Sequence, residues 1–86
     1  DAGEAEIDFT LARAAQGRGI ATAAVEAALG LLWAHTPVQR VLGITDARNT
    51  PSIRLLERLG FRRIETRDAE FKGERCTEFV YAIERP

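Results

Sequence analysis

The chain lacks the residues that cross-link or start most polypeptides. Its 86 residues include one cysteine, Cys76, and no methionine. A single cysteine cannot form an internal disulfide, so we expect a reducing compartment, the cytoplasm. Because no initiator residue is present, we expect a processed chain or a piece of a longer protein.

The chain also lacks an excess of charge of one sign and any long hydrophobic run. The formal net charge is -1 and the pI is about 5.8, which leaves no basic footprint for nucleic acid. No uninterrupted apolar run reaches the roughly 18 residues of a membrane span, and no signal-peptide pattern is present. With 45% hydrophobic and 29% charged residues, the composition indicates one soluble globular domain without nucleic-acid or membrane partners.

The hydrophobic patterns in the first half predict a strand, a long helix and a second strand. Residues 6–11 alternate apolar and polar side chains, residues 20–34 are apolar almost all round, and residues 41–45 form a short apolar run. A helix that is apolar all round is expected to be covered on more than one side. His35 is expected to complement the dipole at its end. The two strands are expected to be parallel neighbours.

The second half predicts a shorter helix and a hairpin. Thr50 is the expected N-cap, Pro51 the first helical residue and Gly60 the residue that ends the helix. Residues 61–67 and 76–83 predict two antiparallel strands with a turn over residues 68–74. The order β-α-β-α-β-β indicates an α/β fold with a mixed sheet. Apolar residues at helical spacing form the expected buried stripe of the short helix: Ile53, Leu56 and Leu59.

A glycine-rich turn, Gln16-Gly17-Arg18-Gly19-Ile20-Ala21, precedes the long helix. Free N–H groups and the positive end of a helix dipole make such a turn suitable for phosphate. A Walker A loop is excluded because no Lys-Ser/Thr follows the glycines. A dinucleotide fingerprint fits poorly because Thr22 stands where a third glycine belongs. From the turn alone, glycines that serve only turn geometry remain the simpler interpretation.

Two separated motifs, taken together, are more specific. Leu11 is followed by Gln16-x-x-Gly19-x-Ala21, and a later stretch reads Arg48-Asn49-Thr50-Pro51-Ser52-Ile53-Arg54-Leu55-Leu56-Glu57-Arg58-Leu59-Gly60-Phe61. The pair resembles the acyl-CoA loop and the Asn-x-x-Ser…Gly-Phe signature of the RimJ/RimL-like branch of the GNAT acyltransferase superfamily. Phe71-Lys72-Gly73-Glu74 resembles the hairpin turn of that branch. The resemblance covers nearly the whole chain.

The resemblance implies an N-acetyltransferase that uses acetyl-CoA. An amine, either a protein N-terminus or a small amine, would attack the thioester directly. Gly17 and Gly19 would let backbone amides approach the pyrophosphate, where a Cβ would hold them away. Asn49 would hydrogen-bond the pantetheine arm. The residues implied to contact the cofactor are Phe9, Leu11, Gln16, Gly17, Arg18, Gly19, Ile20, Ala21, Thr22, Asn49 and Ser52.

Two residues are candidate catalytic groups. By resemblance, Ser52 occupies the position proposed to assist the departing thiolate. Glu6 lies on the strand near the implied thioester and is a candidate general base. Simpler interpretations stay open, because serine is common in a first helical turn and strand-face carboxylates are usually solvated. Leu56 stands where many family members have a tyrosine, which excludes a tyrosine acid at that position.

The resemblance further implies the sheet order 1-2-4-3, with the first strand at an open edge. Family members carry an N-terminal half that shapes the acceptor site, and this sequence does not contain it. An exposed edge invites pairing, so we expect self-association, or association with the missing half, through that strand. Two alternatives remain: a non-catalytic CoA-binding or assembly module, and a dinucleotide-binding βαβ fragment. The sequence does not identify the amine acceptor, and it predicts no metal site.

Overall fold

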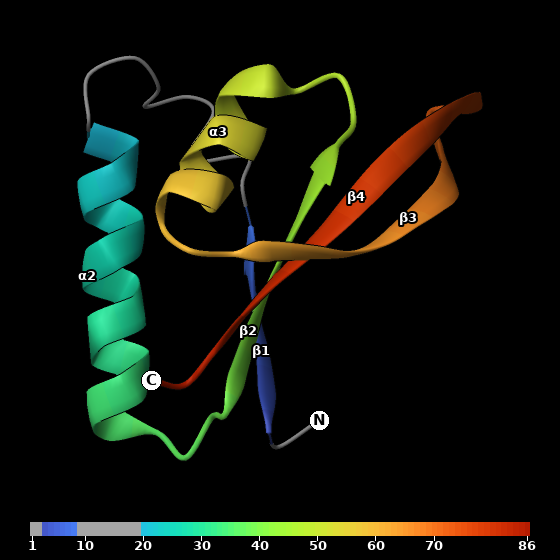
Figure 1. The fold of residues 1–86 in the computed structure, drawn as a ribbon. Helices are drawn as coiled ribbons and strands as arrows, with labels where there is room; N and C mark the ends of the chain where they lie inside the picture. Colours follow the sequence, from blue (N-terminus) through green and yellow to red (C-terminus); the bar gives the residue numbers. More distant parts are fainter. Residues whose placement is uncertain (1–2, 9–19) are drawn as a thin grey trace.

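The computed structural model describes residues 3–8 and 20–86. Four strands form one mixed sheet in the order β1-β2-β4-β3, in which β1 is parallel to β2 and the other neighbours are antiparallel (Figure 1). This arrangement confirms the predicted α/β fold and strand order. The elements are β1 (Glu4–Asp8), α2 (Ile20–His35), β2 (Arg40–Asp46), α3 (Thr50–Arg58), β3 (Arg62–Phe71) and β4 (Glu74–Glu84).

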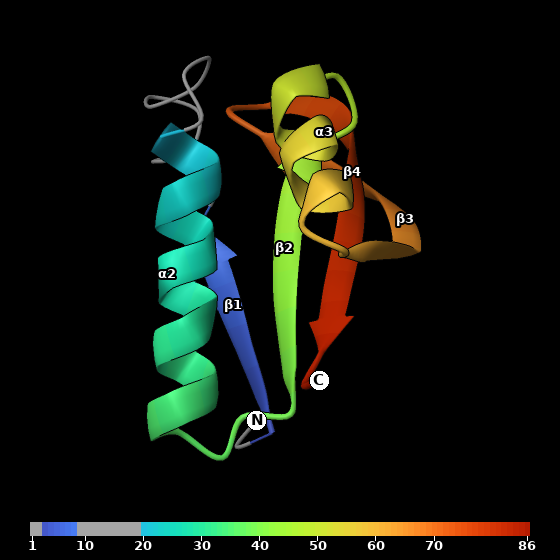
Figure 2. The same ribbon diagram turned by 60° about the vertical axis from the view of Figure 1, so that its left-hand side comes forward.

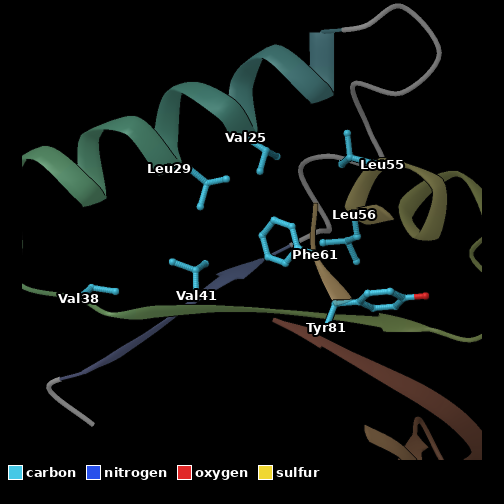
Figure 3. Packing of buried hydrophobic residues seen from close by; sticks show 8 residues of the cluster. All are labelled: Val25, Leu29, Val38, Val41, Leu55, Leu56, Phe61 and Tyr81. Carbon is cyan, nitrogen blue, oxygen red and sulfur yellow. The ribbon is translucent and has the colours of Figure 1, made fainter. Parts of the chain in front are cut away.

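Both helices pack on the same face of the sheet, and the core lies between them and the strands (Figures 2 and 3). Strand alternation explains which residues enter the core. β2 buries every second residue, starting at Val41, while Leu42 and Ile44 point to the opposite face. We call that opposite face the open face, because no helix within the described ranges covers it. The buried core cluster consists of Val25, Leu29, Val38, Val41, Leu55, Leu56, Phe61 and Tyr81.

Helix α2 is covered on one side only by the described residues. Val25 and Leu29 are buried against the sheet, whereas Leu31 on the outer side is 62% exposed. The expectation of cover on more than one side is therefore not met within residues 3–8 and 20–86. We call the exposed apolar side the outer face of α2. Its members are Ala23, Ala24, Ala27, Gly30, Leu31 and Ala34.

Helix α3 ends as the sequence predicts. Gly60 has φ +95°, and its N–H donates to the Glu57 carbonyl over 3.1 Å while the Phe61 N–H donates to the Leu56 carbonyl over 2.9 Å. These two bonds form a Schellman motif, which requires a left-handed residue after the helix. The predicted buried stripe is partly wrong. Leu56 is buried, but Ile53 and Leu59 are only half-buried, and Leu55 and Ser52 are buried in their place.

The hairpin turn is shorter than predicted. β3 continues to Phe71 and β4 begins at Glu74, so the expected turn over residues 68–74 is wrong. Only Lys72 and Gly73 form the turn, with φ 53° and 80°. Two consecutive positive φ values are the mark of a type I′ turn, whose twist matches that of the flanking strands. Beyond the end of β2, the two strands continue as a projecting arm (Figure 1).

The C-terminal end of the described chain is held against the end of α2 by Arg85. Its guanidinium donates to the carbonyls of Trp33, Thr36 and Val38 over 2.8, 2.6 and 2.9 Å. The same group lies 5.1 Å from the centre of the Trp33 ring. These carbonyls lie at and just beyond the C-terminal end of α2, where a cation is favourable. Arg85, rather than the exposed His35 side chain, makes these contacts.

Candidate functional site

The ends of four elements meet at one edge of the molecule. β1 and β2 are parallel, so their carboxyl ends lie side by side, and both helices begin at this end (Figures 1 and 2). We call it the carboxyl edge. Ligands of open α/β sheets bind outside the carboxyl ends of strands. The first turn of α2 contains no acidic residue, so no carboxylate there competes with an anion for the helix N-terminus.

A tight turn of residues 46–49 connects β2 to α3 at this edge. The Asp46 carboxylate accepts hydrogen bonds from the Arg48 backbone N–H over 2.7 Å and from its guanidinium Nε and Nη2 over 3.0 Å each. The Asp46 carbonyl accepts from the Asn49 N–H over 2.9 Å. The hydrogen bond and charge of Asp46 raise the pKa of Arg48, which stays cationic. Within the turn, the negative charge of Asp46 is therefore balanced by the positive charge of Arg48.

Asn49 is the N-cap of α3. Its side-chain oxygen accepts from the Ser52 N–H over 3.2 Å, and its carbonyl accepts from Ile53 N–H over 3.1 Å. The prediction of Thr50 as N-cap is wrong by one residue: Thr50 is the first helical residue and Pro51 the second. Because the oxygen of the Asn49 side-chain amide accepts the Ser52 N–H, the amide nitrogen remains as a hydrogen-bond donor.

The N-terminus of α3 offers no free amide to an anion. Thr50 N–H donates to the Arg48 carbonyl over 3.0 Å, Pro51 has no N–H, and the next two N–H groups are bound by Asn49. These partners satisfy the backbone N–H groups that have no partner within the first turn of a helix. Of the two helix starts at the carboxyl edge, α2 is thus the one suited to phosphate.

The two candidate catalytic residues lie on different faces of the sheet. Ser52 is 3% exposed and lies in the first turn of α3, on the helix-covered side. Glu6 pairs with Leu42 in the parallel register and shares its open face, where its side chain is exposed. The structure therefore brings Ser52 and Asn49 together and separates Glu6 from both.

Most of the other predicted cofactor contacts lie outside the described residues. Ile20 and Ala21 are the first residues of α2, and Thr22 is half-buried in its first turn. The structure does not describe Phe9, Leu11, Gln16, Gly17, Arg18 or Gly19, so these positions stay predictions. In the described ranges, no group of three or more His, Cys, Asp or Glu side chains is arranged to hold a metal ion. Among the same residues, no helix is both long and apolar enough to cross a membrane.

Sequence analysis missed Asp46. An aspartate at the end of a strand, two residues before an arginine, favours a turn in which its side chain binds backbone N–H groups. That local signal was present in Asp46-Ala47-Arg48. The family motif includes Asn49 and Ser52 but not Asp46, although Asp46 holds the turn that ends at Asn49, directly before α3.

The geometry defines an α/β domain in which the carboxyl ends of two parallel strands and the starts of two helices lie at one edge. Comparison with known families is more specific: residues 1–62 match the model described as "Acetyltransferase (GNAT) domain". The chain therefore belongs to the GNAT acetyltransferase family. This membership removes the dinucleotide-binding alternative. No curated protein matched the chain.

Solved structures of the family share the fold. A GNAT-family acetyltransferase from Bacillus anthracis has a TM-score of 0.74 and 28% identity over 81% of this chain and 43% of its own. The ribosomal-protein-S5-alanine acetyltransferase of Vibrio fischeri has a TM-score of 0.76 and 20% identity over 85% and 41%. NAA60 of Arabidopsis thaliana, in complex with acetyl-CoA, has a TM-score of 0.73 and 22% identity over 80% and 40%. The chain thus spans less than half the length of these structures, and the similarity of the last two concerns the fold.

Proposed function

We propose that the chain is the acyl-CoA-binding portion of an N-acetyltransferase. In this proposal an acetyl group passes from acetyl-CoA to a primary amine, either a protein N-terminus or a small amine. The amine nitrogen attacks the thioester carbonyl, the C–N bond forms and the C–S bond breaks. The amine proton leaves to a base, and the sulfur departs as a thiolate that takes up a proton. Residues 1–86 are the binding portion in this view.

The carboxyl edge is the observation that carries the proposal. Its parallel strands, the N-terminus of α2 and the 46–49 turn lie at one end of the molecule. Such an edge suits an extended ligand with an anionic diphosphate at one end and amide groups along its arm. NAA60, which shares the fold, is described in complex with acetyl-CoA. The RimJ/RimL-like motif adds that protein N-termini are suitable acceptors.

Asn49 and Ser52 take distinct roles in this proposal. The Asn49 oxygen is bound to the Ser52 N–H, so Asn49 acts on the pantetheine arm as a donor, through its amide nitrogen, to a carbonyl. Ser52 is buried in the first turn of α3, where its hydroxyl serves the departing thiolate once the cofactor lies along that turn. Orientation and proton transfer are the needs these groups meet.

The turn of residues 16–21 is proposed to hold the pyrophosphate. Backbone amides from Gln16 to Ala21 donate to the phosphoryl oxygens, and the N-terminus of α2 adds its positive dipole end. Phe9 and Leu11 pair with the pantetheine arm, and Arg18 and Thr22 flank the phosphates. These assignments rest on the motif, and the start of α2 at Ile20 supports them.

Glu6 is proposed to meet the acceptor from the opposite side. Its side chain is exposed on the open face, while Asn49 and Ser52 lie on the helix side. An amine that approaches over the open face reaches the thioester without crossing the cofactor. In that arrangement Glu6 accepts the amine proton.

The second candidate function is a non-catalytic CoA-binding or assembly module. It is favoured by one observation: the chain covers 40–43% of the length of the acetyltransferases compared above. Calorimetric titration with acetyl-CoA, followed by an acetyl-transfer assay with an N-terminal peptide and a small amine, separates the candidates. Binding with turnover supports the enzyme, and binding without turnover supports the module. No binding at all would overturn both.

A matched pair of glycine variants ties binding to the 16–21 turn. Gly19→Val is expected to weaken acetyl-CoA binding by at least tenfold, because a branched side chain holds the backbone away from the phosphates. Gly30→Ala is the control, since a Cβ at this exposed helical position meets nothing within 4 Å. It should leave binding unchanged. Equal binding by both variants would remove the turn from the site.

We further propose that the free edge of β1 is an association surface. Within residues 3–8 and 20–86, β1 is an outer strand that pairs with β2 alone, and unpaired strand edges recruit further strands. The occupant is the missing half of the acetyltransferase sheet or a second copy of the chain. A stable monomer at high concentration in size-exclusion chromatography with light scattering would contradict self-association. We also propose a cytoplasmic location, consistent with the single cysteine.

A further inference from the structure

We propose that Asp46 is a positioning residue of the acyl-CoA site. Through Arg48 and its own carbonyl, Asp46 fixes the 46–49 turn, and the turn presents the Asn49 amide nitrogen to the cofactor. The inference rests on the proposed function. Neither the family motif nor the comparisons assign a role to this residue.

The first support is the number of bonds that one residue makes. Both carboxylate oxygens of Asp46 are used: one accepts from the Arg48 N–H and Nε, and the other accepts from Nη2. The Asp46 carbonyl accepts from Asn49 N–H over 2.9 Å. Asp46 therefore fixes the backbone on both sides of Arg48.

The second support is continuity from the sheet to the helix. Asp46 pairs with Glu78 in the β2–β4 register, and the Ala47 N–H donates to the Thr77 carbonyl over 2.8 Å. At the other end, Asn49 caps α3 through the Ser52 N–H. The 46–49 turn thus joins a rigid strand to a capped helix, and a site held by rigid elements keeps its geometry.

The third support is electrostatic. An uncompensated carboxylate at the carboxyl edge would repel the phosphates of the cofactor. The two-pronged contact with Arg48 neutralises Asp46 there, and bidentate pairs of this kind are strongly directional. The Arg48 side chain is 80% exposed, and ion pairs with such exposure contribute little to global stability. Removal of the pair should therefore disturb the turn much more than the fold.

The test compares Asp46→Ala with Asp46→Asn and with Glu84→Ala. Glu84 is a matched control, because it forms an ion pair of similar length with Arg40, 3.0 Å, at the opposite end of the sheet. Acetyl-CoA binding is measured by calorimetry and the melting temperature of each variant is recorded. Asp46→Ala should weaken binding about tenfold, the size of one lost oriented hydrogen bond. Asp46→Asn, which can still accept from the Arg48 N–H, should lie between, and Glu84→Ala should bind as wild type does.

A double-variant cycle tests whether Asp46 acts through Asn49. Asn49→Ser keeps a side-chain oxygen that can cap α3 but removes the amide nitrogen. In that background Asp46→Ala should cause no further loss of binding. Full additivity, or Asp46→Ala binding as wild type does, would overturn the positioning role alone. A wild-type chain that binds no acetyl-CoA would overturn the proposed function itself, and the inference with it.

Discussion

The two helices of this domain pack on the same face of the sheet in different ways. α3 has nine residues, begins at an asparagine cap and ends at a glycine in a Schellman motif. Its exposed side carries charged residues such as Arg54 and Arg58. α2 has sixteen residues and an apolar outer face on which Leu31 is 62% exposed. Neighbouring residues cap both ends of α3, and its outer side is charged. The outer side of α2 is apolar and suited to packing against another segment or chain.

The difference shows where local sequence is sufficient. Caps and an amphipathic pattern fix the length and orientation of α3 without help from distant residues. At the C-terminal end of α2, Thr36 binds the Leu32 carbonyl locally, but the carbonyls of Trp33, Thr36 and Val38 accept from a distant residue, Arg85. The outer face of α2, like the edge of β1, is a surface that a longer acetyltransferase or a second copy could cover.

The largest expected effect contrasts one leucine of each helix. Leu56 on α3 is 0% exposed, so Leu56→Ala should lower the free energy of unfolding by about 3 kcal/mol through lost burial and a residual cavity. Leu31→Ala on α2 should change it by less than about 0.5 kcal/mol, as expected of an exposed position. Urea titration followed by circular dichroism measures both.

The outcome for Leu31 decides what covers α2. If Leu31→Ala costs as much as Leu56→Ala in the isolated chain, the outer face is buried in an oligomer, and the cost should fall on dilution. If the cost stays small at every concentration, α2 packs on one side only in this chain. The first result would remove the contrast between the helices, and the second would confirm it.

The sequence predicts the elements because their signals are local. Gly60 after a stripe of leucines and the alternation along β4 predict the end of α3 and the last strand. The predicted cap of α3 is wrong by one residue because Asn49 and Thr50 are both good cap residues. Pro51 is tolerated at either of the first two helical positions, since neither N–H has a helical partner.

The predicted turn over residues 68–74 overlooks a strand pattern, because the charged Asp68 and Glu70 alternate with Ala69 and Phe71, and all four pair with residues 74–77 of β4. The sequence cannot predict features that arise from distant contacts. Arg85 is 47 to 52 residues away from the carbonyls it binds, and no local pattern announces such a contact. Of the candidate site, the motif predicts Asn49 and Ser52, and Asp46-Ala47-Arg48 favours a local turn, but the contacts of Asp46 with the Arg48 guanidinium and the Asn49 N–H come from the structure.

Arg85→Ala should have the second largest effect. It removes three charged hydrogen bonds to carbonyls at and beyond the end of α2, and each such bond contributes roughly 1.5–3 kcal/mol before the water that replaces the guanidinium is counted. We expect a net loss of about 2 kcal/mol and faster amide exchange in the last turn of α2. Arg85→Lys should recover less than half, because a lysine cannot reach three carbonyls as a planar fork.

The control for Arg85 lies in α3. In Arg85→Ala, the amide exchange rates of Leu55 and Leu56 should change only as much as the loss of global stability requires, because the caps of α3 are intact in this variant. A loss confined to α3, with α2 unaffected, would contradict the role given to Arg85. Equal stability of Arg85→Ala and wild type would show that water replaces the guanidinium without cost.

Gly60→Ala tests the end of α3. Gly60 has φ +95°, a region that residues with a Cβ enter at a cost of about 1–2 kcal/mol. The added Cβ would lie 3.7 Å from the Ile83 Cδ1, an ordinary contact, so the cost is conformational rather than steric. We expect about 1.5 kcal/mol lower stability in thermal unfolding. Gly30→Ala on α2 should act in the opposite direction, and a loss at both positions would refute the conformational explanation.

The smallest predicted effect concerns the bond that joins α3 to β4. The buried Tyr81 hydroxyl donates to the Glu57 carboxylate over 3.1 Å, and burial, followed by this bond, raises the pKa of Tyr81 above its usual 10.0. Tyr81→Phe should therefore cost about 1 kcal/mol at neutral pH. Because the unfolded tyrosine ionises first, wild-type stability should fall as the pH rises above about 10, while the phenylalanine variant should lose less. Parallel urea titrations at pH 7 and pH 10.5 measure both. A difference between the two proteins that stays constant across this range would contradict the raised pKa of Tyr81, and equal stability of the two proteins at pH 7 would show that its hydrogen bond to Glu57 does not stabilise the packing of α3 on β4.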